Sequence, residues 1–134
     1  MDDHPLNILL VDDDEVDVMT VKRAFSRANI TNKLYVATDG IEALNILRSD
    51  GIPPSRRLML LDLNMPRMSG IEVLREIRAD PKIRSVPLVI MSASSETKHA
   101  EDAMAAGANF FMTKPFNLTT LKDVITQLMR PPQS

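Results

Sequence analysis

Residues 8–15 read ILLVDDDE, an apolar run that changes at once into an acidic run. Residues 58–62, LMLLD, repeat the change from apolar to acidic. Strands of a parallel sheet read as continuous apolar runs because helices cover both faces, so both stretches are predicted to form central strands. Ligands of an open parallel sheet bind beyond the carboxyl ends of its strands. Asp12, Asp13 and Asp62 are therefore expected to lie close together if the two strands are neighbours.

Three carboxylates in one pocket need a cation. Two like charges about 4 Å apart repel by about 4 kcal/mol at an effective dielectric constant near 20. Oxygen ligands without histidine or cysteine favour magnesium, manganese or calcium over zinc, and few protein ligands with room for water favour magnesium. The sequence therefore predicts a Mg²⁺ site at this edge of the sheet.

Strand and helix patterns alternate along the whole chain, which predicts an α/β fold. The predicted strands are residues 8–11, 34–37, 58–61, 86–91 and 109–112. Right-handed crossovers between them give a doubly wound, five-stranded parallel sheet flanked by five helices. The predicted helices carry the apolar stripes Val18, Val21, Phe25 and Ala28; Ile41, Leu44 and Leu47; Ile71, Leu74 and Ile77; an alanine-rich segment at 97–106; and Leu118, Leu121, Ile125 and Leu128.

Two helix starts carry capping signals. Ser69 and Glu72 have the spacing of a capping box, in which two side chains satisfy backbone donors at the start of a helix. Asn117 is suited to cap the last helix. Asp14 and Glu15 are expected to be charges in the first turn of the first helix, where acidic residues favourably oppose the helix dipole.

Length and composition limit the class of protein. The 134 residues, 44 % of them hydrophobic, suit a single domain with its own core. The absence of cysteine excludes disulfides and thiol chemistry. The N-terminus lacks the features of a signal peptide, and no apolar run approaches the roughly 20 residues that cross a bilayer. We therefore expect a cytoplasmic protein that does not enter a membrane.

The net charge of −2 argues against direct nucleic-acid binding. Basic residues do cluster in the middle of the chain, and we expect their side chains to be solvated. These residues are Arg56, Arg57, Arg67, Arg75, Arg78, Lys82 and Arg84.

Polar residues with distinct chemistry stand at successive predicted strand ends. After the pair Asp12 and Asp13 come Asp62, Ser92 and Lys114, in that order. This arrangement resembles the receiver domain of two-component response regulators, over about residues 7–129. The resemblance implies a flavodoxin-like fold for residues 1–134, with a short tail at each end. It also implies a signalling domain that catalyses its own phosphorylation and dephosphorylation, not an enzyme acting on other substrates.

The resemblance assigns roles in phosphoryl transfer. Asp62 is the expected phosphoacceptor, attacking a phosphoryl group carried by a histidine kinase or a histidine phosphotransfer protein. Asp13, Asp62 and the backbone carbonyl of Asn64 are expected to ligate Mg²⁺ directly, and Asp12 through water.

The resemblance also assigns a switch. Lys114 is expected to pair with the phosphoryl oxygens and Ser92 to donate a hydrogen bond to them, while Phe111 turns inward. Ser92 stands where threonine is commoner and Phe111 where tyrosine is commoner. For Phe111 the alternative is a plain core position, and Phe110 competes with it for the inward place.

Three other functions share parts of this pattern. A flavodoxin-like flavin-binding protein needs a first loop rich in glycine and hydroxyl groups, but residues 12–15 are all acidic. An aspartate-nucleophile phosphohydrolase, similar to the haloacid dehalogenase family, needs an acid two residues after its nucleophile, where this chain has Asn64. A phosphorylation-independent adaptor with the receiver fold is the third alternative.

A stand-alone receiver with no output domain must signal by protein contact or onward phosphotransfer. The family implies a changed surface at the fourth helix, fifth strand and fifth helix, and homodimers through that surface. The connection from Asp80 to Pro87 and the long loop at 50–55 resemble those of the small regulators that partner bacterial phytochromes.

Overall fold

The computed structural model describes residues 7–27, 33–49, 57–63, 65, 68–92 and 97–114, and single positions at 119, 120, 122, 123 and 126. Within them, strands and helices alternate as predicted. Their bounds are β1 Asn7–Val11, α1 Glu15–Arg27, β2 Leu34–Ala37, α2 Gly40–Arg48, β3 Arg57–Asp62, α3 Gly70–Ala79, β4 Leu88–Ser92, α4 Thr97–Ala105 and β5 Phe110–Thr113.

The predicted fifth helix lies mostly outside the described residues. Positions 119, 120, 122, 123 and 126 are helical. Its apolar stripe and the proposed cap Asn117 fall on undescribed positions, so that part of the prediction stays a prediction.

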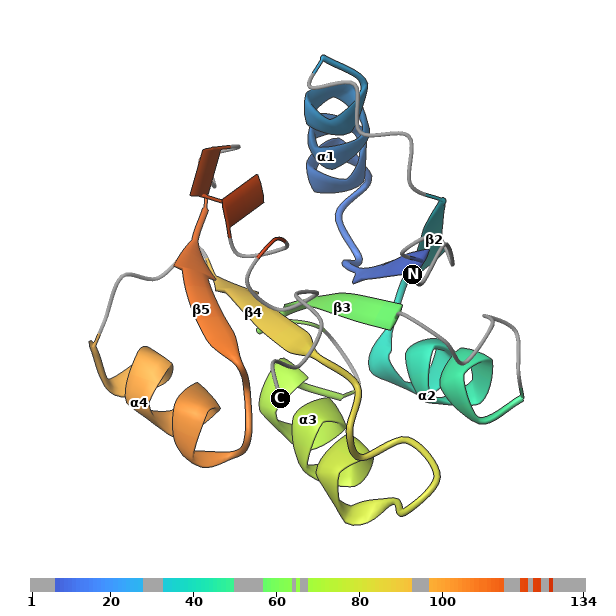
Figure 1. The fold of residues 1–134 in the computed structure, drawn as a ribbon, viewed down its shortest axis with the longest axis vertical. Helices are drawn as coiled ribbons and strands as arrows, with labels where there is room; N and C mark the ends of the chain where they lie inside the picture. The colour runs from blue at the N-terminus through green and yellow to red at the C-terminus, as the bar shows by residue number, and fades with distance from the viewer. Residues whose placement is uncertain are drawn as a thin grey trace, which may run out of the picture.

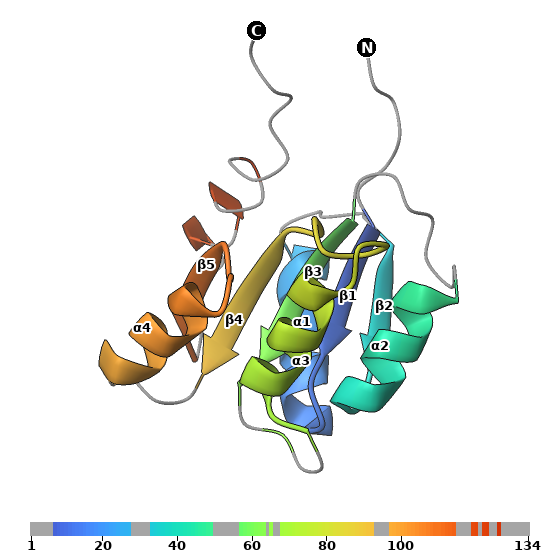
Figure 2. The same ribbon diagram turned by 90° about the horizontal axis from the view of Figure 1, so that it is seen from below.

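All five strands form one parallel sheet in the order β2-β1-β3-β4-β5. Figure 1 shows the sheet nearly edge-on, with α1 on one face and α2, α3 and α4 on the other, and Figure 2 shows the strands side by side. This is the doubly wound arrangement that the alternating pattern predicted. Because β1 and β3 are neighbours, residues that follow these two strands meet at the same edge of the sheet.

Alternation along the strands divides the core between the two faces. Ile8 and Leu10 of β1 pack with Val21 and Phe25 of α1. Leu9 and Val11 of β1 pack on the opposite face, in the core that α2, α3 and α4 cover. Both faces of the central strands are therefore buried, which explains why their sequences read as continuous apolar runs.

One predicted stripe is partly wrong. Leu44 and Leu47 of α2 are buried, but the side chain of Ile41 is 51 % exposed. The helix begins at Gly40, and its buried face consists of Gly40, Ala43, Leu44 and Leu47. Ile41 stands one residue, about 100° of rotation, away from that face.

The capping box at the start of α3 is confirmed. The Ser69 Oγ accepts a hydrogen bond from the Glu72 backbone N–H at 3.3 Å, and the Glu72 Oε1 accepts one from the Ser69 backbone N–H at 3.2 Å. The helix therefore starts at Gly70, eight residues after the end of β3.

The prediction of a solvated side chain is wrong for Arg78, which is half-buried. Its guanidinium donates hydrogen bonds to the backbone carbonyls of Arg84, Val86 and Gly107 and to the Asn109 Oδ1, at 2.8 to 3.1 Å. Burial lowers the pKa of Arg78. This side chain joins α3 to the segments that lead into β4 and β5.

Across the described residues, none of the helices combines the length and the apolar character that crossing a membrane requires.

Candidate functional site

Four polar residues lie at the carboxyl ends of adjacent strands. Asp62 and Ser92 are the last residues of β3 and β4, while Asp12 and Lys114 directly follow β1 and β5. The backbone ladder continues through these positions: the Asp12 N–H donates to the Ala37 carbonyl at 3.1 Å, and the Lys114 N–H to the Ser92 carbonyl at 2.7 Å. The sheet thus holds the backbones of these residues in place.

Carboxylates of Asp12, Asp13 and Asp62 form a compact cluster. One oxygen of each lies within 4.8 Å of the others. Asp12 is 1 % exposed and Asp62 is 5 % exposed, whereas Asp13 is exposed. Burial raises the pKa of Asp12, and the hydrogen bond from the Asp14 backbone N–H and the nearby Lys114 oppose that shift. The cluster therefore carries an electrostatic cost that a cation relieves.

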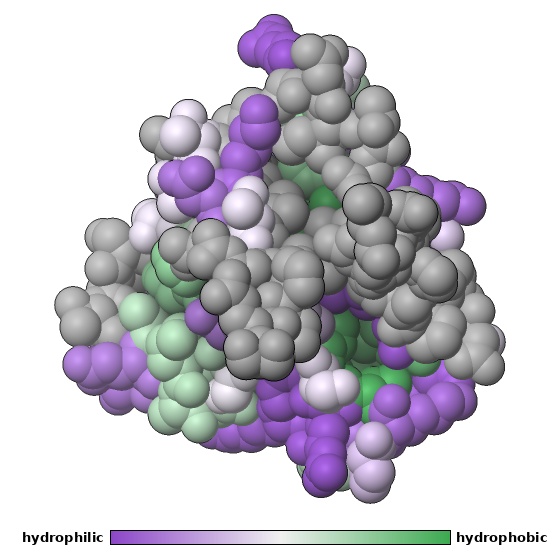
Figure 3. Space-filling model, viewed as in Figure 1, coloured by the Kyte–Doolittle hydropathy of each residue, from purple (hydrophilic) through white to green (hydrophobic). Residues whose placement is uncertain are grey.

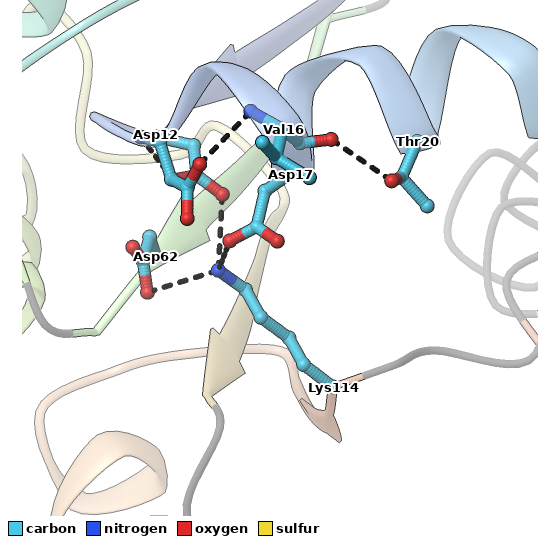
Figure 4. A network of polar contacts seen from close by, with 7 residues as sticks. Asp12, Val16, Asp17, Thr20, Asp62 and Lys114 are labelled. Carbon is cyan, nitrogen blue, oxygen red and sulfur yellow. Dashed lines mark hydrogen bonds and ion pairs between the residues drawn. The ribbon is translucent and has the colours of Figure 1, made fainter.

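The Lys114 ammonium reaches three carboxylates, as Figure 4 shows. Its Nζ lies 2.7 Å from the Asp17 Oδ2, 3.0 Å from the Asp12 Oδ2 and 3.5 Å from the Asp62 Oδ1. Burial alone would lower the pKa of Lys114, but hydrogen bonds to Asp17 and Asp12 and the charge of Asp62 more than offset it, so the pKa is raised. The surrounding carboxylates therefore favour the charged form of Lys114.

Asp17 is the site residue that the sequence analysis missed. It lies in the first turn of α1, four residues before Val21 of the predicted apolar stripe. That spacing was the available signal, because residues four apart share a helix face. Only the tertiary structure shows that the face points at Lys114, 97 positions further along the chain.

Asp14 and Glu15 have the predicted places at the start of α1. The Asp14 Oδ1 accepts a hydrogen bond from the Val16 backbone N–H at 2.9 Å, and Glu15 is the first helical residue. Both are exposed. Their negative charges lie at the positive end of the helix dipole, which stabilises the helix.

The proposed switch residues lie on neighbouring strands. Ser92 is fully buried at the end of β4. Phe111 of β5 is half-buried and packs on the core that faces α2, α3 and α4, while Phe110 packs on the core that faces α1. The two phenylalanines therefore occupy different faces and do not compete for one position. Asn64, the expected carbonyl ligand, lies outside the described residues.

Comparison with known proteins identifies the family. The family model of the response regulator receiver domain matches residues 8–126. The chain belongs to this family. Its members are signalling domains that interact with histidine kinases or phosphotransfer proteins, not classical enzymes.

Curated relatives of this receiver domain share about a third of its residues. Response regulator Rcp1 of Synechocystis is 35 % identical, covering 87 % of the chain and 82 % of the relative. Chemotaxis protein CheY of Pseudomonas aeruginosa is 32 % identical, covering 92 % and 95 %. The sequence is thus that of a CheY-type receiver domain.

Solved structures agree with this assignment. The bacteriophytochrome response regulator AtBRR has a TM-score of 0.80 at 29 % identity, covering 98 % of this chain and 97 % of that one. The phosphorylated cyanobacterial phytochrome response regulator RcpA has a TM-score of 0.74 at 30 % identity, covering 93 % and 91 %. The receiver domain therefore has the flavodoxin-like fold predicted from its sequence.

Proposed function

We propose that the chain accepts a phosphoryl group on the Asp62 carboxylate and signals through the resulting change of its surface. The observation that carries this proposal is the position of Asp62. Its carboxylate lies at the end of a central strand, within 4.8 Å of two further carboxylates and 3.5 Å from the Lys114 ammonium. A nucleophile, a potential metal site and a fixed cation thus meet at one strand end.

The proposed transfer is a direct displacement at phosphorus. An Asp62 oxygen forms a bond to the phosphorus of a phosphohistidine, and the bond from phosphorus to the imidazole nitrogen breaks. The leaving imidazole keeps the electron pair and takes up a proton. The product is an acyl phosphate on Asp62 and a neutral histidine on the donor.

The three carboxylates suit Mg²⁺. Their ligand atoms are all oxygen, they lie close enough to share one ion, and the exposed Asp13 leaves one side open to solvent. Asp13 and Asp62 would hold the ion directly and Asp12 through water, with the Asn64 carbonyl as a further ligand. A bound Mg²⁺ offsets the charge of the carboxylate nucleophile and the phosphoryl group.

Lys114 and Ser92 would recognise the phosphoryl group once it is attached. Lys114 supplies a point charge to a phosphoryl oxygen, and the buried Ser92 hydroxyl supplies a hydrogen bond. By the family resemblance, the Ser92 hydroxyl would move toward the phosphoryl group. Phe111 on the adjacent strand β5 then follows inward.

The surface that changes would be that of α4 and β5. Figure 3 shows a pale green, apolar area at the left of the view, over α4. Met104 of α4 is 47 % exposed. Phe111 of β5 packs against the core that includes Ala103 of α4. A movement of Phe111 would therefore alter a surface that already suits protein contact.

We propose that residues 1–134 act as one receiver domain in the cytoplasm. A histidine kinase or phosphotransfer protein would supply the phosphoryl group. Since similar structures include the phytochrome response regulators AtBRR and RcpA, a phytochrome kinase is our preferred donor. The switched surface would contact a protein partner or a second copy of the chain.

Intact mass spectrometry tests the proposal. The protein is incubated with acetyl phosphate and Mg²⁺, beside a sample with EDTA and a folded Asp62→Asn variant. We expect one phosphoryl group on the wild type, and none on the variant or without metal. No gain by a folded wild type that binds Mg²⁺ would contradict phosphorylation and favour the phosphorylation-independent adaptor.

A further inference from the structure

We infer that Asp17 is a positioning residue for Lys114. Asp17 holds the Lys114 ammonium beside α1 and keeps it from moving closer to Asp62. The inference deepens the proposed function and rests on it for the role of Asp62 as metal ligand and nucleophile. Asp17 is not one of the clustered carboxylates; it acts through the lysine.

The distances favour this role. A lysine ammonium has three donors. Those of Lys114 make hydrogen bonds to Asp17 at 2.7 Å and Asp12 at 3.0 Å, while Asp62 lies at the longer distance of 3.5 Å. Both short contacts come from the segment that connects β1 to the first turn of α1. The ammonium is therefore held more closely by Asp17 and Asp12 than by Asp62, and Figure 4 shows its contacts to all three carboxylates.

The position of Asp17 is set by the packing of α1. Val21, four residues further along the helix, is 1 % exposed in the core beneath α1. Residues four apart share a helix face, so the packing that buries Val21 also directs Asp17 at the sheet. The Asp17 side chain is 36 % exposed and that of Lys114 only 16 %, so the ion pair is partly shielded from solvent.

Loss of the Asp17 charge would redirect the lysine. Besides Asp12, which the ammonium already contacts at 3.0 Å, Asp62 is the carboxylate that Lys114 reaches, at 3.5 Å. An ammonium that moves closer to Asp62 competes with a divalent cation for the same oxygens. Asp17 thus keeps Asp62 available for Mg²⁺, and a phosphoryl oxygen arriving on Asp62 would compete with Asp17 for the lysine.

A double-mutant cycle on Mg²⁺ affinity tests the inference. Calorimetry measures Mg²⁺ binding to the wild type, Asp17→Asn, Lys114→Met and the double variant. We expect Asp17→Asn to weaken Mg²⁺ binding about threefold to tenfold when Lys114 is present, and much less in the Lys114→Met background. Asp17→Glu, which keeps the charge, should recover part of the affinity.

The matched control is Glu15→Gln. Glu15 is an exposed acidic residue in the same helical turn, so Glu15→Gln changes the net charge of the protein by the same amount as Asp17→Asn. We expect less than about a twofold effect on Mg²⁺ affinity, because exposed charges are screened. An equal effect of Asp17→Asn with and without Lys114, or a wild type that binds no Mg²⁺, would overturn the inference.

A metal-free measurement separates the inference from the proposed function. In EDTA, nuclear magnetic resonance of the ¹⁵N-labelled lysine ammonium groups should show a shifted, faster-exchanging Lys114 signal in Asp17→Asn, but not in Glu15→Gln. An unchanged signal would contradict the positioning role. Failure of the wild type to gain a phosphoryl group, with an intact cycle on Mg²⁺ binding, would instead contradict phosphorylation and leave the Asp17 inference standing.

Discussion

Gly70 packs directly against the backbone of Asp62. A Cβ at Gly70 would lie 2.6 Å from the Asp62 carbonyl oxygen and 2.8 Å from the Leu63 Cα. The Gly70 N–H also donates a hydrogen bond to the Leu63 carbonyl at 2.9 Å. The start of α3 therefore supports the peptide that carries the proposed phosphoacceptor, and only glycine allows this close approach.

Gly70→Ala should slow phosphorylation as well as weaken the fold. The added methyl group displaces the backbone of Asp62, since backbone atoms cannot move aside as a side chain can. We expect a loss of about 1–3 kcal/mol in the free energy of unfolding and a lower rate of phosphorylation by acetyl phosphate. Urea unfolding and timed mass spectrometry measure the two effects.

Gly40→Ala is the matched control, because Gly40 is also the first residue of its helix. A Cβ there would meet the Val73 Cγ2 and the Met68 side chain, not the Asp62 peptide. This variant should lose stability while the folded protein keeps the wild-type phosphorylation rate. Equal rates for both variants would show that Gly70 has no special effect on Asp62.

Arg78→Met should destabilise the protein without affecting Mg²⁺ binding. The substitution keeps an unbranched apolar stem but removes the guanidinium and its hydrogen bonds to the carbonyls of Arg84, Val86 and Gly107. We expect a cost of about 2–4 kcal/mol in the free energy of unfolding, because partly buried carbonyls lose their donors.

The control for Arg78 is Arg75→Met, an exposed position on the same helix. Its effect should stay within about 0.5 kcal/mol. Urea unfolding in the presence of EDTA measures both variants. Similar small losses would show that water replaces the guanidinium at these carbonyls.

Lys114→Met should destabilise the metal-free protein more than the Mg²⁺-bound protein. The ammonium compensates the buried Asp12 carboxylate, and its removal should cost about 1–3 kcal/mol at neutral pH. Mg²⁺ supplies replacement charge, so the difference in melting temperature between variant and wild type should narrow when EDTA is replaced by Mg²⁺.

Lys22→Met is the corresponding control, since Lys22 is an exposed lysine of α1. It should show no difference between EDTA and Mg²⁺. If the deficit of Lys114→Met is the same in both conditions, the lysine and the metal do not share the same carboxylates.

Asp80 should contribute stability that disappears in acid. The hydrogen bond from the Lys82 backbone N–H, and then that from Arg48, lowers the pKa of Asp80 below its ordinary value of 3.8. A lowered folded pKa gives stability that is present above 3.8 and is lost as the pH falls through the folded value. The substitution Asp80→Asn would keep an acceptor for the Lys82 N–H but remove the charge.

The measurement compares the free energy of unfolding of wild type and Asp80→Asn as a function of pH. The advantage of the wild type should be constant between about pH 5 and pH 7, and should shrink below about pH 4. Asp102→Asn, at an exposed carboxylate on α4, removes the same charge and serves as the control. A difference that is independent of pH would show that the charge of Asp80 does not stabilise the fold.

Local patterns were sufficient to predict much of this fold from the sequence. Apolar runs predict buried parallel strands because both faces of such strands are covered, and the Ser69 and Glu72 capping box predicts the start of α3 because its hydrogen bonds span three residues. The convergence of Asp12 and Asp62 followed from the rule that parallel strands end at one edge, once β1 and β3 are neighbours.

Contacts between distant segments were decided only by the tertiary structure. Three contacts depend on how the helices pack on the sheet. They are the ion pair of Asp17 with Lys114, the close approach of Gly70 to Asp62, and the hydrogen bonds from Arg78 to three backbone carbonyls. The exposure of Ile41 depends on the same packing. By itself the sequence determined which residues could reach the carboxyl edge of the sheet, because strand pattern and strand ends are local properties. Helix packing determined which of these residues touch one another. A charged or small residue gives the same local sequence pattern whether its helix face meets solvent or the site.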